Sequence, residues 1–132
     1  MANDTPYLFV YGTLRTAVNI PAKEEVLSNL ELVGEAEIRG AMYDMGDYPA
    51  AVQDDNNTIR GEILKVIDPD KVFRVLDGYE GSAYRRGKVN VTLPDGTNTE
   101  AWIYWYTQPV TGKTLIKHKS YLDYLNNRDN VY

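Results

Sequence analysis

The chain contains no cysteine and only one histidine, which excludes several kinds of site before any motif is considered. Without cysteine there are no disulfides, no thiolate nucleophiles, no cysteine-ligated zinc and no iron–sulfur clusters. A single histidine cannot build a multi-histidine metal site. We therefore expect chemistry that relies on oxygen and nitrogen groups, with no cofactor and no metal.

Positive charge is also scarce, because 14 Lys and Arg residues stand against 19 Asp and Glu residues and give a net charge of -5. A general nucleic-acid binder needs clustered cations to displace phosphate counterions, so we expect no nucleic-acid partner. No apolar run approaches the ~20 residues of a membrane span, and the N-terminus lacks the basic start and apolar stretch of a signal peptide. We expect a cytoplasmic protein without a membrane partner.

A length of 132 residues fits one domain with an apolar core of its own. Apolar runs separated by Gly, Pro and Asp/Asn clusters predict short strands at residues 7–10, 31–38, 41–45, 50–53, 58–67, 88–93 and 99–106. Helices are predicted at residues 21–30, 69–78 and 115–125. Many strands with two or three helices indicate an α+β fold with a curved, mainly antiparallel sheet.

The first candidate site is the loop Tyr11-Gly12-Thr13-Leu14-Arg15, which follows the predicted buried strand at residues 7–10. A glycine in such a turn lets a ligand approach the backbone closely, and successive N–H groups can then hold a carboxylate or an oxyanion. The alternative is a simple turn that ends the strand. Taken alone, the loop does not decide between the two.

The second candidate is Glu80, which comes just after the predicted end of a helix at Gly78. Its neighbours include Leu76, Tyr79 and Tyr84, so partial burial and the negative end of the helix dipole would both raise the pKa of its carboxyl group. A raised pKa suits a general base that works near neutrality. The alternative is a solvated surface charge, which is the usual state of a glutamate.

Taken together and in order, these segments resemble the γ-glutamyl cyclotransferase-like superfamily. The Tyr-Gly-Thr-Leu loop is similar to that of the γ-glutamylamine cyclotransferase and AIG2-like branch. The resemblance covers about residues 7–106 and leaves the tail, residues 107–132, outside it. Its motifs are Tyr11-Gly12-Thr13-Leu14-Arg15, Tyr48-Pro49-Ala50-Ala51, Gly61-Glu62-Ile63-Leu64, Leu76-Asp77-Gly78-Tyr79-Glu80-Gly81, Tyr84-Arg85-Arg86 and Ala101-Trp102-Ile103-Tyr104.

The resemblance implies an enzyme that cyclises a γ-glutamyl amine or amide to 5-oxoproline and releases the free amine. It implies that Tyr11, Gly12, Thr13 and Leu14 bind the γ-glutamyl group, largely through the backbone, and that Glu80 is the proton acceptor. It also implies a mixed, barrel-like sheet with flanking helices. The amine that leaves is not specified by any motif.

Three further residues follow Glu80 closely. Tyr84 is a candidate to orient the carboxylate or the substrate, with packing in a strand as the alternative. Arg85 and Arg86 are interpreted as solvated charges at a strand edge rather than as catalytic groups, with contact of one of them with a carboxylate as the alternative. For the whole chain, the principal competing hypothesis is a non-catalytic module that binds a small ligand or a protein on the same fold. A third hypothesis is a purely structural or oligomerisation domain.

Overall fold

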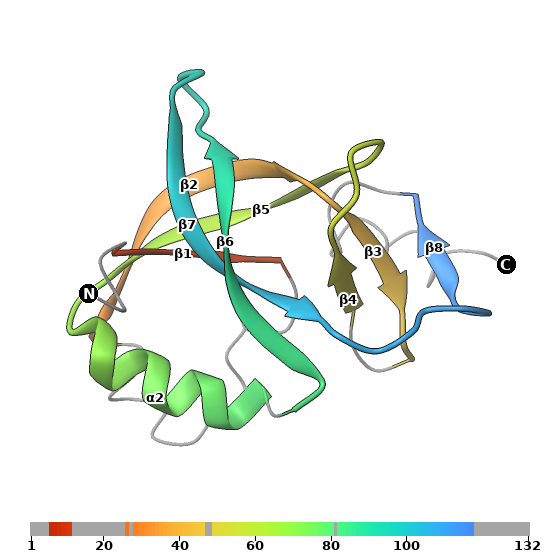
Figure 1. Cartoon of the computed structure of the whole chain (residues 1–132). Coiled ribbons are helices and arrows are strands. Elements are labelled where there is room, and N and C mark those ends of the chain that lie inside the picture. Colours follow the sequence, from red (N-terminus) through yellow and green to blue (C-terminus); the bar gives the residue numbers. More distant parts are fainter. Residues whose placement is uncertain (1–5, 12–25, 27, 47–48, 81, 118–132) are drawn as a thin grey trace, which may run out of the picture.

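The computed structural model describes residues 6–11, 26, 28–46, 49–80 and 82–117, and of Tyr79 and Glu80 it describes only the backbone. Within this part of the chain the strands form a closed barrel, a small three-stranded sheet lies beside it, and helix α2 lies along one side of the barrel (Figure 1). No helix among the described residues is long and apolar enough to cross a bilayer.

The barrel closes in the order β1, β5, β2, β6, β7. Every neighbouring pair is antiparallel except β1 and β7, which run parallel and meet at Leu8 and Trp102. The predicted α+β class, with a mixed and mainly antiparallel barrel-like sheet, is therefore confirmed. The barrel strands are β1 (Tyr7–Val10), β2 (Leu30–Arg39), β5 (Thr58–Val66), β6 (Tyr84–Thr92) and β7 (Asn98–Tyr106).

Two barrel strands begin earlier than the sequence predicts. β6 begins at Tyr84 rather than near Lys88, because it pairs with β7 along its whole length and so includes Arg85 and Arg86. β2 begins at Leu30, which was expected to end a helix. Val26 and Ser28 of that predicted helix are helical, and the rest of it lies outside the described residues.

The small sheet has the order β4 (Pro49–Val52), β3 (Ala41–Asp44), β8 (Thr114–Ile116). The prediction of a helix from Leu115 is wrong at its start, because residues 114–116 pair with β3 and place Ile116 opposite Met42. Both of these side chains are buried in the core. The remainder of the predicted tail helix lies outside the described residues.

Helix α2 (Pro69–Glu80) begins where the sequence predicts and ends later. The Asp68 carbonyl accepts a hydrogen bond from Val72 N at 3.1 Å, and Asp68 itself has φ 56°, a left-handed conformation that aspartate tolerates better than most residues. The predicted end at Gly78 is wrong, because the helix continues to Glu80. A helical glycine costs only about 1 kcal/mol, and the burial of Leu76 one turn before the end offsets that cost. Glu80 is thus the last helical residue.

Two apolar clusters build the core, and β1 contributes to both. The first fills the barrel and includes Phe9 and Tyr11. The second lies between the barrel and α2 and includes Leu8 and Val10, together with Val72, Phe73 and Leu76 of the helix. Strand β1 is therefore covered on both faces, as its continuous apolar run predicts.

Strand β7 shows the same two-sided burial. Ala101, Ile103 and Trp105 belong to the cluster inside the barrel, whereas Trp102 and Tyr104 pack with the cluster beneath α2. The sequence predicts these two faces from the alternation of side chains along a strand. That prediction is confirmed, and it sets which residues of β7 can reach the helix.

A tight turn joins β6 to β7, as Pro94-Asp95-Gly96 predicts. Asp95 Oδ1 accepts hydrogen bonds from the hydroxyl of Thr97 at 2.6 Å and from its backbone N–H at 2.9 Å. These two bonds, the hydroxyl first, hold the pKa of Asp95 below its ordinary value. Gly96 has φ 85°, which favours glycine at that position.

Candidate active site

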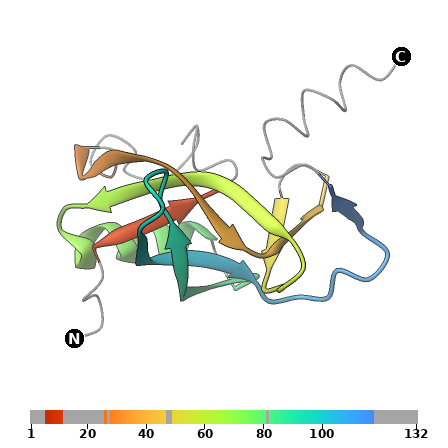
Figure 2. The ribbon, with the colours of Figure 1, turned by 90° about the horizontal axis from the view of Figure 1, so that it is seen from above.

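The two segments that carry the candidate chemistry end on the same side of the molecule. Strand β1 and helix α2 both run toward the side of the molecule where the small sheet lies (Figures 1 and 2). Leu8 and Val10 of β1 share one buried cluster with Val72, Phe73 and Leu76 of α2, which lies between the barrel and the helix. This packing fixes the end of β1 relative to the end of α2.

Tyr11 is the described part of the predicted substrate loop. Its side chain is 8% exposed and packs in the barrel, where its ring stacks on Phe9 with centroids 6.5 Å apart. Its hydroxyl donates a hydrogen bond to the backbone carbonyl of Tyr104 at 2.6 Å. The Tyr11 side chain therefore anchors the start of the loop to β7.

The other predicted loop residues, Gly12, Thr13 and Leu14, lie outside the described residues. The side chain of Glu80 does too, although its backbone forms the last residue of α2. The roles assigned to these four residues remain predictions. What the structure does describe is the frame that leads into each of them: β1 before the loop and α2 before Glu80.

Tyr84 lies at the start of β6, a short distance along the chain from the end of α2. Its hydroxyl donates a hydrogen bond to the backbone carbonyl of Pro49 at 3.1 Å, and its ring meets Tyr106 edge to face with centroids 5.4 Å apart. Tyr84 thus links β6 to β4 of the small sheet.

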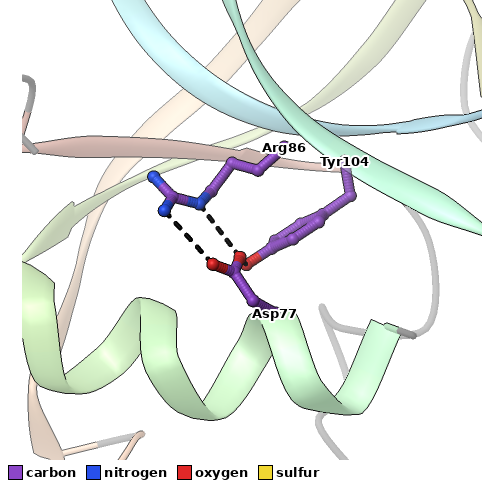
Figure 3. Close-up of polar contacts among 3 residues, drawn as sticks. All are labelled: Asp77, Arg86 and Tyr104. Atoms are coloured by element: carbon purple, nitrogen blue, oxygen red, sulfur yellow. Dashed lines mark hydrogen bonds and ion pairs between the residues drawn. The ribbon is translucent and has the colours of Figure 1, made fainter. Parts of the chain in front are cut away.

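A polar network next to the helix end was not predicted (Figure 3). Arg86 of β6 donates two hydrogen bonds to Asp77 of α2, from Nε to Oδ1 at 3.0 Å and from a terminal nitrogen to Oδ2 at 3.2 Å. The hydroxyl of Tyr104 donates to the same Oδ1 at 2.7 Å. Helix α2 is therefore joined to two barrel strands one turn before it ends.

The interpretation of Arg86 as a solvated charge is wrong. Its side chain is 17% exposed, and its guanidinium lies over the rings of Phe73 and Trp102, 4.2 and 4.4 Å from their centroids. Aromatic faces and a bidentate carboxylate are the surroundings that a guanidinium prefers. The alternation of β6 could have indicated this, because it puts Tyr84 and Arg86 on one face.

Arg85 lies on the opposite face of β6 and is exposed, as predicted. It borders a cavity of about 380 Å³ together with Gln53, Gly87 and Trp105. Among the described residues no group of three or more His, Cys, Asp or Glu side chains could hold a metal ion.

Comparison with known proteins decides the family. The family model described as gamma-glutamyl cyclotransferase, AIG2-like, matches residues 8–123 of the chain. The chain belongs to this family. A gamma-glutamylcyclotransferase family protein of Citrobacter rodentium, YtfP, is 32% identical over 117 residues, which cover 88% of this chain and 95% of that protein.

Solved structures agree with the assignment to the gamma-glutamyl cyclotransferase, AIG2-like family. The solution structure of YtfP from Escherichia coli is 31% identical, with a TM-score of 0.64, and covers 94% of this chain and 99% of that one. The crystal structure of an AIG2-like protein from Mus musculus has a TM-score of 0.71 over 88% of this chain and 87% of that one. At 23% identity the mouse protein shows a shared fold alone.

The family match extends beyond the motifs recognised in the sequence. Those motifs end near residue 106, whereas the match continues to residue 123 and so includes β8. Since β8 completes the small sheet, part of the tail at residues 107–132 belongs to the fold of this chain.

Proposed function

We propose that the chain is a cyclotransferase that converts a γ-glutamyl amine or amide into 5-oxoproline and a free amine, with Glu80 as general base and then general acid. The substrate's α-amino nitrogen attacks its own γ-carbonyl carbon, and Glu80 takes a proton from that nitrogen. As the intermediate collapses, the bond between the γ-carbonyl carbon and the amine breaks, and Glu80 returns the proton to the departing nitrogen. No water is consumed.

This reaction suits a chain without cysteine and with one histidine. The nucleophile belongs to the substrate, so the protein need not supply one, and closing a five-membered ring benefits from the proximity of the two groups. The protein has to hold the substrate in a folded conformation, move one proton and stabilise the oxyanion that forms on the γ-carbonyl oxygen.

In the proposal, backbone N–H groups from Tyr11 to Leu14 bind the γ-glutamyl group and the developing oxyanion. The anchoring of the Tyr11 hydroxyl on Tyr104 supports a backbone role, because that hydroxyl is already engaged. Tyr84 would border the same site, since its hydroxyl bonds to Pro49 and its strand begins shortly after α2 ends.

The observation that carries the proposal is the parallel packing of β1 and α2 in a chain of this family. Helical periodicity places position 80 on the same side of α2 as Phe73 and Leu76, which are both buried against β1 and its neighbours. This periodicity supports Glu80 as the base, because position 80 continues the face of the helix that packs on the barrel.

The substrate is tested with a panel of γ-glutamyl-ε-lysine, γ-glutamyl amino acids and glutathione, measured as 5-oxoproline released. We expect turnover of at least one γ-glutamyl compound, and the preferred member identifies the leaving amine. Calorimetric binding of panel members without any product would instead favour the non-catalytic binding module. If no panel member is bound or turned over, both hypotheses are contradicted for this substrate class.

A further inference from the structure

The contacts around Asp77 are concentrated on the last part of α2. Asp77 accepts hydrogen bonds from Arg86 and Tyr104, which come from adjacent strands and lie directly opposite each other in the β6–β7 pairing. Arg86 is itself held between Phe73 of the helix and Trp102 of β7. One carboxylate thus ties the helix to both strands of the hairpin.

The same residues also connect to the start of the predicted substrate loop. The backbone carbonyl of Tyr104 accepts the hydrogen bond from the Tyr11 hydroxyl, while the Tyr104 side chain reaches Asp77 (Figure 3). Tyr104 therefore contacts the residue before Gly12 at one end and the helix that ends at Glu80 at the other. A shift of α2 would move Glu80 with the helix, whereas the loop after Tyr11 stays attached to β7. The distance between the two proposed parts of the site would then change.

We infer that Asp77, Arg86 and Tyr104 form a positioning clamp that fixes the end of α2, and with it Glu80, relative to the substrate loop. The inference rests on the proposed function, because it assigns the clamp a role in catalysis rather than in stability alone. None of the three is placed in contact with substrate. They act through Glu80, which follows Asp77 by three positions on the helix.

A nearby ion pair shows what a contact without this role looks like. Lys88 lies on the same face of β6 as Arg86, 5.2 Å from the centroid of Trp102, and pairs with Glu100 of β7 at 3.5 Å. The pair joins β6 to β7, which the backbone ladder already joins. Lys88→Gln is therefore the control for removing a positive charge from the same face of β6 as Arg86.

The clamp makes a prediction about pH that a purely structural role does not. Asp77 precedes Glu80 by three positions, a spacing that makes side chains neighbours on a helix surface. Removing the charge of Asp77, or that of its partner Arg86, therefore shifts the pKa of Glu80, in opposite directions for the two. Arg86→Gln removes the positive charge beside Asp77, raises that pKa and moves the acidic limb of kcat/KM to higher pH. Asp77→Asn removes the negative charge beside Arg86 and moves the limb to lower pH.

Charges on the other packed elements do not change between these variants. They include Asp70 and Arg74 on earlier turns of α2, Glu62 on β5, Arg85 on the far face of β6, and Glu100 on β7. Their fields are common to the whole series. Opposite shifts from the two partners of one ion pair therefore come from the charges that these two substitutions remove.

The experiment measures kcat, KM and the pH dependence of kcat/KM for the wild type and five variants, with the substrate that the panel identifies. Asp77→Asn and Arg86→Gln should lower kcat about tenfold or more, because small displacements of a catalytic group are costly, with KM changed less than about twofold. Tyr104→Phe and Arg86→Lys should lower kcat without moving the acidic limb, since charge is retained. Lys88→Gln should leave kcat and the acidic limb of kcat/KM unchanged.

Thermal unfolding of each variant sets an assay temperature at which all of them are folded. Tyr104→Phe is the mildest change, so its kcat still tests the clamp if the other variants fold poorly. The clamp is overturned if the wild type is active and the clamp variants keep its kcat. It is also overturned if the acidic limbs of kcat/KM move in the same direction in Asp77→Asn and Arg86→Gln. A wild type that releases no 5-oxoproline, or full activity in Glu80→Gln, overturns the proposed function itself. The two failures are thus distinguishable.

Discussion

Glu80→Gln is expected to lower the rate of 5-oxoproline release by about 10²- to 10⁴-fold, the usual contribution of a general acid–base group. Glutamine has nearly the same size and cannot accept the proton of the attacking amine, so the loss should appear in kcat with little change in KM. The measurement is steady-state kinetics on the substrate that the panel identifies.

Two further variants define the Glu80 result. Glu80→Asp keeps the carboxylate and withdraws it by one methylene, so its kcat should fall between those of the wild type and Glu80→Gln. Glu31→Gln removes an exposed glutamate at the start of β2 and should have wild-type kinetics. Wild-type turnover by Glu80→Gln would remove the proposed base.

Gly61→Ala is expected to destabilise the fold severely. A Cβ at position 61 would lie 2.2 Å from the carbonyl oxygen of Val10 and 2.8 Å from the ring of Phe9, closer than such atoms approach in proteins. The obstacle is the backbone of β1, which cannot rotate away, so β1 and β5 must separate. Overpacking of this kind costs about 1–3 kcal/mol or more. The damage falls where β1 leads into the substrate loop.

The matched control for Gly61 is Gly34 of β2, a strand that also pairs with β5. A Cβ there would meet nothing within 4 Å, so Gly34→Ala should change the free energy of unfolding by less than about 1 kcal/mol. Urea unfolding measures both variants. A Gly61→Ala protein as stable as the wild type would show that the close approach of β5 to β1 is not required.

Local signals in the sequence predicted much of the fold. The start of α2 after Asp68, the turn at Pro94–Gly96 and the two faces of β7 follow from capping, turn chemistry and alternation, and all are confirmed. The end of α2 was misjudged because Gly78 is a common helix terminator, whereas the burial of Leu76 carries the helix on to Glu80. Strand β8 was missed because a three-residue strand is specified by its partner β3 rather than by its own pattern.

The candidate site was predicted only where it is local in sequence. The loop after β1 and Glu80 carry recognisable motifs, and they remain predictions in their details. The clamp was not predictable in the same way, because Asp77 and Tyr104 are 27 positions apart and meet through the register of β6 on β7 and the seating of α2. Arg86 was interpreted as an edge charge for the same reason, because the rings that cover it belong to α2 and β7 and are distant from it in sequence.

The proposed reaction closes a ring within the substrate and uses no water. The most direct test is to run the reaction in H₂¹⁸O and to identify the products by mass spectrometry. The proposed cyclisation predicts unlabelled 5-oxoproline in equal amount to the released amine, and the same products formed about 10²- to 10⁴-fold more slowly by Glu80→Gln. Glutamate carrying one ¹⁸O would show hydrolysis instead of cyclisation and would contradict the account.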